Sequence, residues 1–130
     1  MATDSKKSSY RDLIVWQRAV DLVPNVYLSL RDFPRVEEFA LSAQIRRASV
    51  SIAANIAEGQ ARSSRKEFRQ YLANAKGSLA ELHTLLVVAQ RLGYVTEQRL
   101  ADLEDQLASV GRPLAGLMDR LALARAERKA

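Results

Sequence analysis

The sequence predicts an all-α fold: a single domain over residues 1–130 that forms an antiparallel, up-down-up-down four-helix bundle. Apolar residues recur at alternating steps of three and four along four separate segments, which is the spacing of amphipathic helices. Five glycines and three prolines are too few for a turn-rich β protein. The connections between the segments are short, which places consecutive helices side by side in opposite directions. Residues 1–9 and 126–130 are expected to be flexible tails.

The first predicted helix follows an apolar stripe that contains a proline. The stripe consists of Leu13, Trp16, Val20, Val23, Tyr27 and Leu30. Pro24 removes a backbone donor and crowds the preceding turn, so it should kink the helix. Because the stripe keeps its register past Pro24, we predict a kink rather than a break. The segment DFPRVEE then provides the turn, with Phe33-Pro34 as the stop.

The second predicted helix runs from about Val36 to Glu58. Its inward-facing residues are Leu41, Ile45, Ala48, Ile52 and Ile56. Gly59 comes directly after it, and glycine readily adopts the left-handed conformation that ends many helices. We therefore expect Gly59 to terminate this helix.

The third and fourth predicted helices have the most regular patterns. SRKE, from Ser64 to Glu67, has the form of a capping box at a helix start. Gly93 should end the third helix and Thr96 should cap the fourth. The inward stripes are Phe68, Leu72, Ala75, Leu79, Leu82, Leu86 and Ala89, and then Leu100, Leu103, Leu107, Val110, Leu114, Leu117 and Leu121. Gly111 to Pro113 interrupts the last stripe without changing its register.

A second apolar face accompanies the inward stripe of the third helix. It consists of Ala73, Gly77, Ala80, Thr84 and Val88, and the second helix has a similar set in Val50, Ala53, Ala54 and Ala57. A glycine inside a helix costs about 1 kcal/mol relative to alanine, so a close backbone approach would explain Gly77. Tight packing of these two helices on each other is one interpretation. The interpretation that we favour is burial against another copy of the protein, which predicts a homo-oligomer.

A polar stripe runs along the second helix beside its apolar face. Its members are Arg47, Ser51, Asn55 and Glu58, and Glu81 of the third helix is a candidate partner of Arg47. These residues could line a polar pocket or a channel. They could instead bond to neighbouring helices and set their register, since buried polar groups are normally paired. We favour the structural interpretation.

The residues needed for most catalytic and metal sites are missing. The chain has no cysteine and one histidine, His83, which we expect to be a packing or capping residue rather than a general base. It also has no glycine-rich phosphate loop. We therefore predict a protein that is not an enzyme and that holds no metal and no cofactor. The N-terminal segment lacks an apolar core, and no run approaches membrane-spanning length, so a cytoplasmic protein without a membrane partner is expected.

A cluster of positive charge follows the second helix. It contains Arg62, Arg65, Lys66, Arg69 and Lys76, against the single acidic residue Glu67 in the same segment. The whole chain has a formal charge of +5 and a pI of about 9.9. Such a cluster could bind phosphates with little sequence specificity, or it could be the solvated end of a bundle. Arg46, Arg47, Arg112 and Arg120 would extend it if copies of the chain come together.

Several segments together resemble a known family. YRDLIVWQRAVDLV, FPRVEEFALSAQIRRASVSIAANIAEGQAR and FRQYLANAKGSLAEL resemble, in order and spacing, the 23S rRNA intervening-sequence proteins. The resemblance covers about Tyr10 to Val95. The matching motif positions, none with an implied catalytic role, are Trp16, Gln44, Arg46, Arg47, Ser51, Asn55, Glu58, Gly59, Gly77, Ser78 and Glu81.

The resemblance implies a four-helix bundle that assembles as a ring, most often a homopentamer. Its implied relatives include accessory proteins of diversity-generating retroelements, which are basic pentameric barrels that bind nucleic acid and a reverse transcriptase. The leading hypothesis is therefore a non-enzymatic oligomer that binds nucleic acid, most of all structured RNA, through pooled basic patches. The alternative is an oligomeric scaffold that recruits a protein such as a reverse transcriptase. A small-ligand pocket around Ser51, Asn55 and Glu58 is a third, weaker hypothesis.

Overall fold

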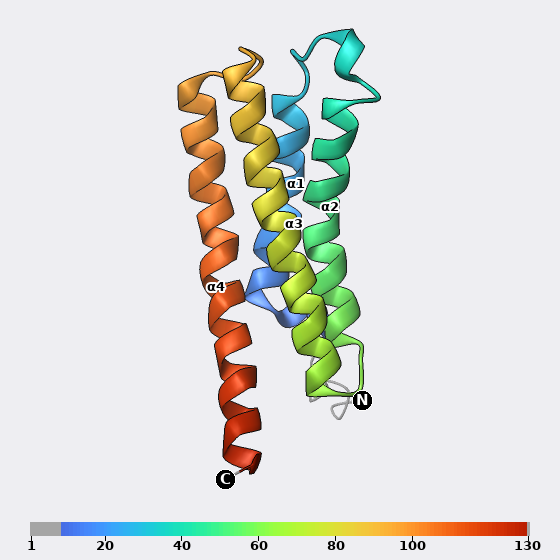
Figure 1. Ribbon diagram of the computed structural model, residues 1–130, viewed down its shortest axis with the longest axis vertical. Coiled ribbons are helices and arrows are strands. Elements are labelled where there is room, and N and C mark those ends of the chain that lie inside the picture. The colour runs from blue at the N-terminus through green and yellow to red at the C-terminus, as the bar shows by residue number, and fades with distance from the viewer. Residues whose placement is uncertain (1–8, 130) are drawn as a thin grey trace.

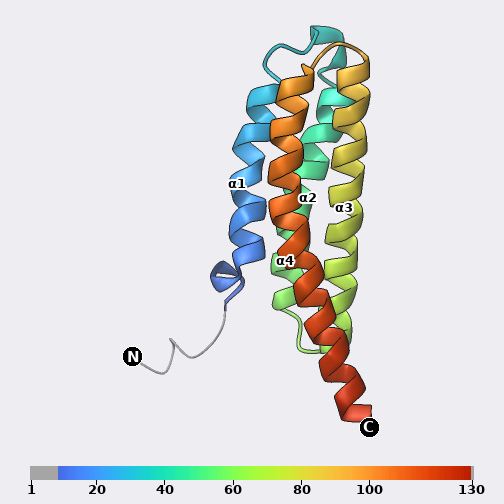
Figure 2. The same cartoon turned by 90° about the vertical axis from the view of Figure 1, so that its left-hand side faces the viewer.

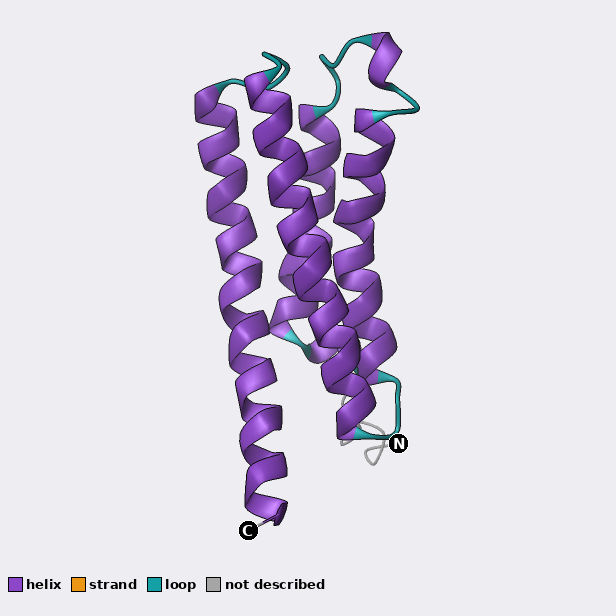
Figure 3. Cartoon of the chain, viewed as in Figure 1, coloured by secondary structure: helices purple, strands orange, loops and turns teal. Residues whose placement is uncertain are grey.

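The computed structural model describes residues 9–129, and this part of the chain is helical with no strand (Figure 3). Four long helices, α1 (Ile14–Ser29), α2 (Leu41–Gln60), α3 (Arg65–Arg91) and α4 (Glu97–Lys129), are joined by short connections. Two 3₁₀ turns, η2 (Tyr10–Asp12) and η3 (Arg35–Glu37), precede α1 and α2. The predicted all-α, four-helix fold is confirmed. Most of the predicted tails, residues 1–8 and 130, lie outside the described residues, whereas the backbone of α4 is helical through Lys129.

The four helices form a closed square in which each packs against two neighbours. The contacting pairs are α1 with α2, α2 with α3, α3 with α4, and α4 with α1 (Figures 1 and 2). The α1–α2 connection and the α3–α4 turn lie at one end of the bundle, and the α2–α3 turn lies at the other (Figure 1). α4 has 33 residues, about 50 Å of helix, and extends past the α2–α3 end (Figure 2). None of the described helices combines the length and the apolar character needed to span a bilayer.

The core lies along the axis of this square and confirms three of the four predicted stripes. All five inward residues predicted for α2 are buried, and those of α3 and α4 are buried or packed against the core. The inward stripes of α3 and α4 each keep their register for about six turns, so the inward sides of these helices could be predicted from spacing alone.

The stripe predicted for α1 is correct in part: Leu13, Trp16 and Leu30 are half-buried against the core, but the most buried side of the helix is rotated away from the stripe. The buried residues of α1 are Val15, Ala19, Leu22, Val26 and Ser29. Val20 and Tyr27, which were expected inside, remain 38% and 42% exposed. The cause is that α1 has two stripes with helical spacing, and its contacts with α2 and α4 bury the one with smaller residues. The helix continues through Pro24, as its register predicted.

Most of the predicted helix ends are confirmed. Gly93 has a φ of 82°, so it adopts the left-handed conformation just after α3. The Thr96 hydroxyl accepts a hydrogen bond from the Arg99 N–H (3.0 Å), and the Ser64 hydroxyl accepts one from the Glu67 N–H (3.1 Å). The second half of the Ser64 capping box differs, because Glu67 accepts its bond from the Ser64 hydroxyl and not from the backbone.

The predicted ends of α2 are wrong at both sides. The helix begins at Leu41, because η3 occupies part of the segment after Val36. It continues through Gly59 to Gln60, and Gly59 has no positive φ. Gly59 is instead buried against α3, where an added Cβ would lie 2.7 Å from the Tyr71 Cβ and 3.0 Å from the Phe68 ring. This glycine therefore permits a close approach of two helices and does not end one.

At the end of the bundle opposite the α2–α3 turn, a hydrogen bond joins the α1–α2 connection to the α3–α4 turn. The Tyr94 hydroxyl in the α3–α4 turn donates to Glu37 Oε2 in η3 (3.0 Å). The Tyr94 ring also packs against Phe33, with 5.2 Å between ring centroids. Glu37 Oε1 in turn accepts a bond from the Leu41 N–H at the start of α2 (3.3 Å). One glutamate therefore links both connections to the first turn of α2.

Candidate nucleic-acid interface

The basic cluster predicted from the sequence lies on the first half of α3 and the turn before it. Arg65, Lys66 and Lys76 are exposed and form no ion pair within the described residues. Arg69 is half-buried, and its Nε atom is buried without a hydrogen-bond partner. Because α3 begins at Arg65, Arg65 and Lys66 stand at the helix end that already has a positive partial charge, and Lys76 follows about three turns later. This end of the bundle therefore favours anions.

Arg62, the first residue of the predicted cluster, is engaged within the chain. Its guanidinium donates to Glu58 Oε1 (3.1 Å) and to the Tyr71 hydroxyl (2.7 Å), and it lies 5.0 Å from the centroid of the Tyr71 ring. Charge interaction with Tyr71 is the largest of the effects that raise the pKa of Arg62, and Glu58 adds to it. Arg62 therefore fixes the α2–α3 turn and is less available to phosphates than Arg65 or Lys76.

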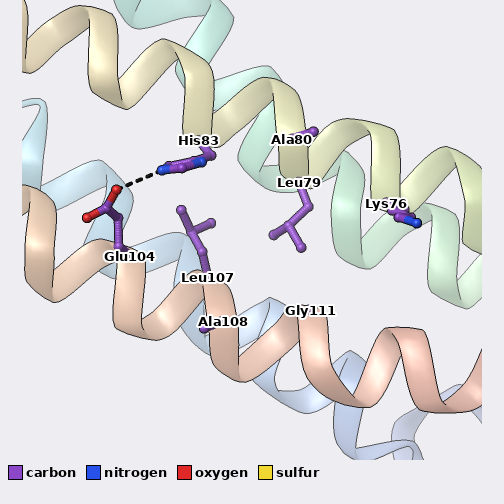
Figure 4. A pocket seen from close by; sticks show the side chains of 8 residues that line it. All are labelled: Lys76, Leu79, Ala80, His83, Glu104, Leu107, Ala108 and Gly111. Carbon is purple, nitrogen blue, oxygen red and sulfur yellow. Dashed lines mark hydrogen bonds and ion pairs between the residues drawn. The ribbon is translucent and has the colours of Figure 1, made fainter.

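A groove between α3 and α4 begins beside Lys76. It has a volume of about 410 Å³, and its walls are mostly apolar. Its lining residues are Lys76, Leu79, Ala80, His83, Glu104, Leu107, Ala108 and Gly111, with Lys76 at one end and His83 at the other (Figure 4). His83 Nε2 lies 2.8 Å from Glu104 Oε2, so the exposed histidine links α3 to α4 and is neither a packing nor a capping residue.

The polar stripe of α2 has two different parts. Ser51 and Asn55, in the middle of the stripe, are half-buried and hydrogen-bonded, whereas Arg47 and Glu58, at its two ends, are exposed. The Ser51 hydroxyl bonds to the Ser78 hydroxyl of α3, and the Asn55 side chain donates to the Ser51 carbonyl (2.8 Å). Glu58 bonds to Arg62. These contacts support the structural interpretation of Ser51 and Asn55.

Arg47 and Glu81, the remaining members of the polar set, do not meet. Both are exposed, and the expected ion pair between them is not formed among residues 9–129. The sequence placed the two side chains on neighbouring helices but could not place them on facing sides.

The second apolar face lies on the surface of the single chain. Ala73, Gly77, Ala80, Thr84 and Val88 of α3 are all exposed, and so are Val50 and Ala54 of α2. A Cβ added at Gly77 would meet nothing within 4 Å. Packing between α2 and α3 therefore does not explain this face or its helical glycine, and the first of the two interpretations given above is wrong for these residues.

Two features at the α1–α2 corner were not expected from the sequence. Val36 and Phe39 are 80% and 89% exposed. Beside them is a hollow of about 370 Å³, mostly polar in its lining. Its lining residues are Leu30, Arg31, Phe33, Pro34, Arg35, Glu38, Ser42 and Arg46. The three arginines are spread over sixteen positions of the sequence, so spacing alone gave no signal of a shared site.

The described residues contain no group of three or more histidine, cysteine or acidic side chains arranged to hold a metal ion. Comparison with known proteins gives two positive findings. Residues 11–116 match the family model of the 23S rRNA-intervening sequence protein. The fold is similar to a crystal structure of a protein with unknown function from the S23 ribosomal protein family of Bacteroides thetaiotaomicron.

The similarity to that structure extends over most of both chains. The TM-score is 0.74 at 25% sequence identity, and the match covers 82% of this chain and 99% of that one. No curated protein matches the chain significantly. A family model that spans residues 11–116 includes α1, α2, α3 and about three fifths of α4. The chain therefore belongs to the 23S rRNA-intervening sequence protein family.

Proposed function

We propose that this protein binds nucleic acid, structured RNA above all, as a homo-oligomer that pools the basic surfaces of its copies. The observation that carries the proposal is the exposed group Arg65, Lys66 and Lys76 on the first half of α3, which has no acidic partner within the described residues. Exposed cations without acidic partners bind phosphates by releasing counterions, and such binding needs no base-specific contact.

The outward face of α3 supports the oligomeric part of the proposal. Gly77 weakens the helix, yet no atom of residues 9–129 occupies the space that it leaves open. A second copy packed on Ala73, Gly77, Ala80, Thr84 and Val88 would use that space. A single chain offers only a few phosphate contacts, and a closed assembly multiplies them at high effective concentration. A ring, such as the pentamer that the family resemblance implies, satisfies both requirements.

The test is binding of a structured RNA by the full chain in a series of salt concentrations. Affinity should fall steeply as salt rises, and the triple substitution Arg65→Glu, Arg69→Glu and Lys76→Glu should remove binding. A control variant reverses the charge of Arg91 and Arg99, which are exposed and lie at the end of α3 and in the first turn of α4, at the opposite end of the bundle. Affinity that is indifferent to salt, or that survives the triple substitution, would contradict the proposal.

A second candidate function is an oligomeric scaffold that recruits a protein such as a reverse transcriptase. The observation that favours it is the α1–α2 corner, where Val36 and Phe39 are 80% and 89% exposed. Large apolar side chains at the tip of a connection are frequent anchors in protein interfaces. A defined protein that co-purifies after nuclease treatment, and is lost from the variant Val36→Ser, Phe39→Ser, would support this function over the first.

A further inference from the structure

The polar hollow at the α1–α2 corner has the composition of an anion site. Arg31, Arg35 and Arg46 line it, with Glu38 as the one acidic residue of the lining, which leaves an excess of positive charge. Arg46 is oriented by a bond from its Nη2 atom to the Glu38 carbonyl (2.9 Å). Arg31 and Arg35 are exposed and form no ion pair within the described residues.

The start of α2 adds backbone donors to this hollow. α2 has 20 residues, and its N-cap residue, Ala40, has no side chain that could accept a hydrogen bond. The Leu41 N–H bonds to Glu37 Oε1, and the Gln44 N–H bonds to the Ala40 carbonyl. The N–H groups of Ser42 and Ala43 have no acceptor among residues 9–129. Free first-turn N–H groups and the helix dipole together attract an anion.

Ser42 gives independent evidence that the hollow is built for a ligand. Its side chain lines the hollow although the residue is only 4% exposed. Its hydroxyl forms no hydrogen bond within the described part of the chain, whereas Arg46 donates to the Glu38 carbonyl one turn before Ser42. The other two buried serines, Ser29 and Ser49, both donate to a backbone carbonyl one turn earlier. The Ser42 oxygen is not one of the fully enclosed atoms that lack a partner, so it can be reached from the hollow, and an anion there would accept its hydrogen bond.

The neighbouring carboxylate of Glu37 does not fill this site. Its two oxygens are engaged, one with the Leu41 N–H and the other with the Tyr94 hydroxyl. The hollow of about 370 Å³ has room for a phosphate group and part of the molecule to which the group is attached.

We infer that this hollow binds a phosphate group, held by the Ser42 hydroxyl, the N–H groups of Ser42 and Ala43, and the guanidinium groups of Arg31 and Arg35. Planar guanidinium groups and first-turn N–H groups are the two protein donors best matched to phosphate oxygens. The site lies at the start of α2, whereas the basic residues of the proposed function follow the end of α2, about 30 Å of helix away. It therefore does not depend on the proposed function. The phosphate could belong to a nucleic-acid chain or to a small phosphorylated molecule.

The test is a titration of the full chain with inorganic phosphate at constant ionic strength. Binding is monitored by NMR, through the amide resonances of Ser42 and Ala43, and by calorimetry. Both resonances should shift and saturate at millimolar phosphate, and chloride should not reproduce the shift. Ser42→Ala should weaken binding about three- to tenfold, and Arg35→Gln about tenfold. Ser42→Ala removes a hydroxyl that has no partner, so the variant should fold normally. Arg99→Gln, an equal loss of charge on α4, should bind phosphate as the wild type does.

Short RNAs with and without a terminal 5′-phosphate separate the two sources of the phosphate. Displacement of inorganic phosphate by either RNA supports the site and identifies a nucleic-acid chain as the source. Binding of inorganic phosphate without displacement supports the site with a small phosphorylated molecule as its ligand. The variant with glutamate at 65, 69 and 76 should keep the phosphate response whether or not it loses RNA. The inference would be overturned if the Ser42 and Ala43 resonances showed no saturable shift. It would also be overturned if the Ser42→Ala and Arg35→Gln variants bound phosphate as tightly as the wild type.

Discussion

Gly59 of α2 lies so close to Tyr71 of α3 that a methyl group at position 59 would stand 2.7 Å from the Tyr71 Cβ. The Phe68 carbonyl, a backbone atom, would lie at 3.2 Å, so rotation of one side chain cannot relieve the crowding. The closest pair of helices in the bundle, α2 and α3, therefore depends on this glycine. The same contact holds Tyr71 where its hydroxyl accepts the Arg62 bond, which links the turn before the basic residues to the core.

Gly59→Ala should destabilise the fold, although alanine is the better helix former. Overpacking of this kind costs about 1–3 kcal/mol, and the gain in helix propensity of about 1 kcal/mol offsets part of it. We expect a net loss of up to about 2 kcal/mol in the free energy of unfolding, measured by urea denaturation at low protein concentration. A Gly59→Ala variant as stable as the wild type would show that the two helices can separate at no cost.

Gly77→Ala tests the outward face of α3 with the same chemical change. No atom of the described residues lies within 4 Å of the added carbon, so the dissociated chain should gain about 1 kcal/mol of stability. If copies pack closely on this face, the methyl group should weaken self-association about tenfold. Sedimentation velocity over a range of concentrations measures this effect. A wild-type chain that remains a monomer throughout, or an assembly unaffected by Gly77→Ala, would contradict the oligomeric part of the proposed function.

The Ser51–Ser78 hydrogen bond predicts a measurable coupling between α2 and α3. Both residues are half-buried, so the bond should contribute about 1 kcal/mol. A double-mutant cycle with Ser51→Ala, Ser78→Ala and the double variant isolates it, because each single variant leaves one hydroxyl without its partner. If the losses in the free energy of unfolding, measured by urea denaturation, were strictly additive, the two serines would act independently. The polar stripe of α2 would then have another role.

Tyr94 predicts a loss of stability in alkaline solution. Its hydrogen bond to Glu37 is the main cause that raises the pKa of the phenol above its ordinary value of 10.0, with burial and the carboxylate charge adding to it. Because the pKa is higher in the folded chain, the stabilisation is complete below pH 10.0 and is lost as pH rises through the folded value. Thermal unfolding from neutral to alkaline pH measures this loss. Tyr94→Phe should reduce the pH dependence in that range, whereas Tyr27→Phe should leave it unchanged.

The inward sides of α2, α3 and α4 could be predicted because each of these helices alternates steps of three and four along a long stripe of Leu, Ile, Val and Ala. α1 could not be oriented in this way. Its two candidate stripes, one with Leu22 and Val26 and one with Trp16 and Tyr27, both have helical spacing. Contact with α2 and α4 selects between them, and that choice is a property of the assembled bundle.

The candidate site could be predicted only in part, from the positions of its charged residues along the predicted helices. Cations at the start of a predicted helix are exposed unless another element covers them, so Arg65 and Lys66 were placed correctly on the surface. The engagement of Arg62 required Tyr71, nine positions further along, and could not be read from charge. The α1–α2 hollow required the end of α1, η3 and α2 to converge, and no periodic pattern encodes that convergence.

The salt dependence of RNA binding tests the central claim most directly. If Arg65, Lys66 and Lys76 of α3 contact phosphates, a plot of log affinity against log salt concentration should have a steep negative slope. Lys76→Gln should reduce that slope by about 0.7–0.9 for each copy that touches the RNA, and Arg91→Gln, the same loss of charge at the other end of α3, should not. Equal slopes for the wild type and the Lys76→Gln variant would contradict the account.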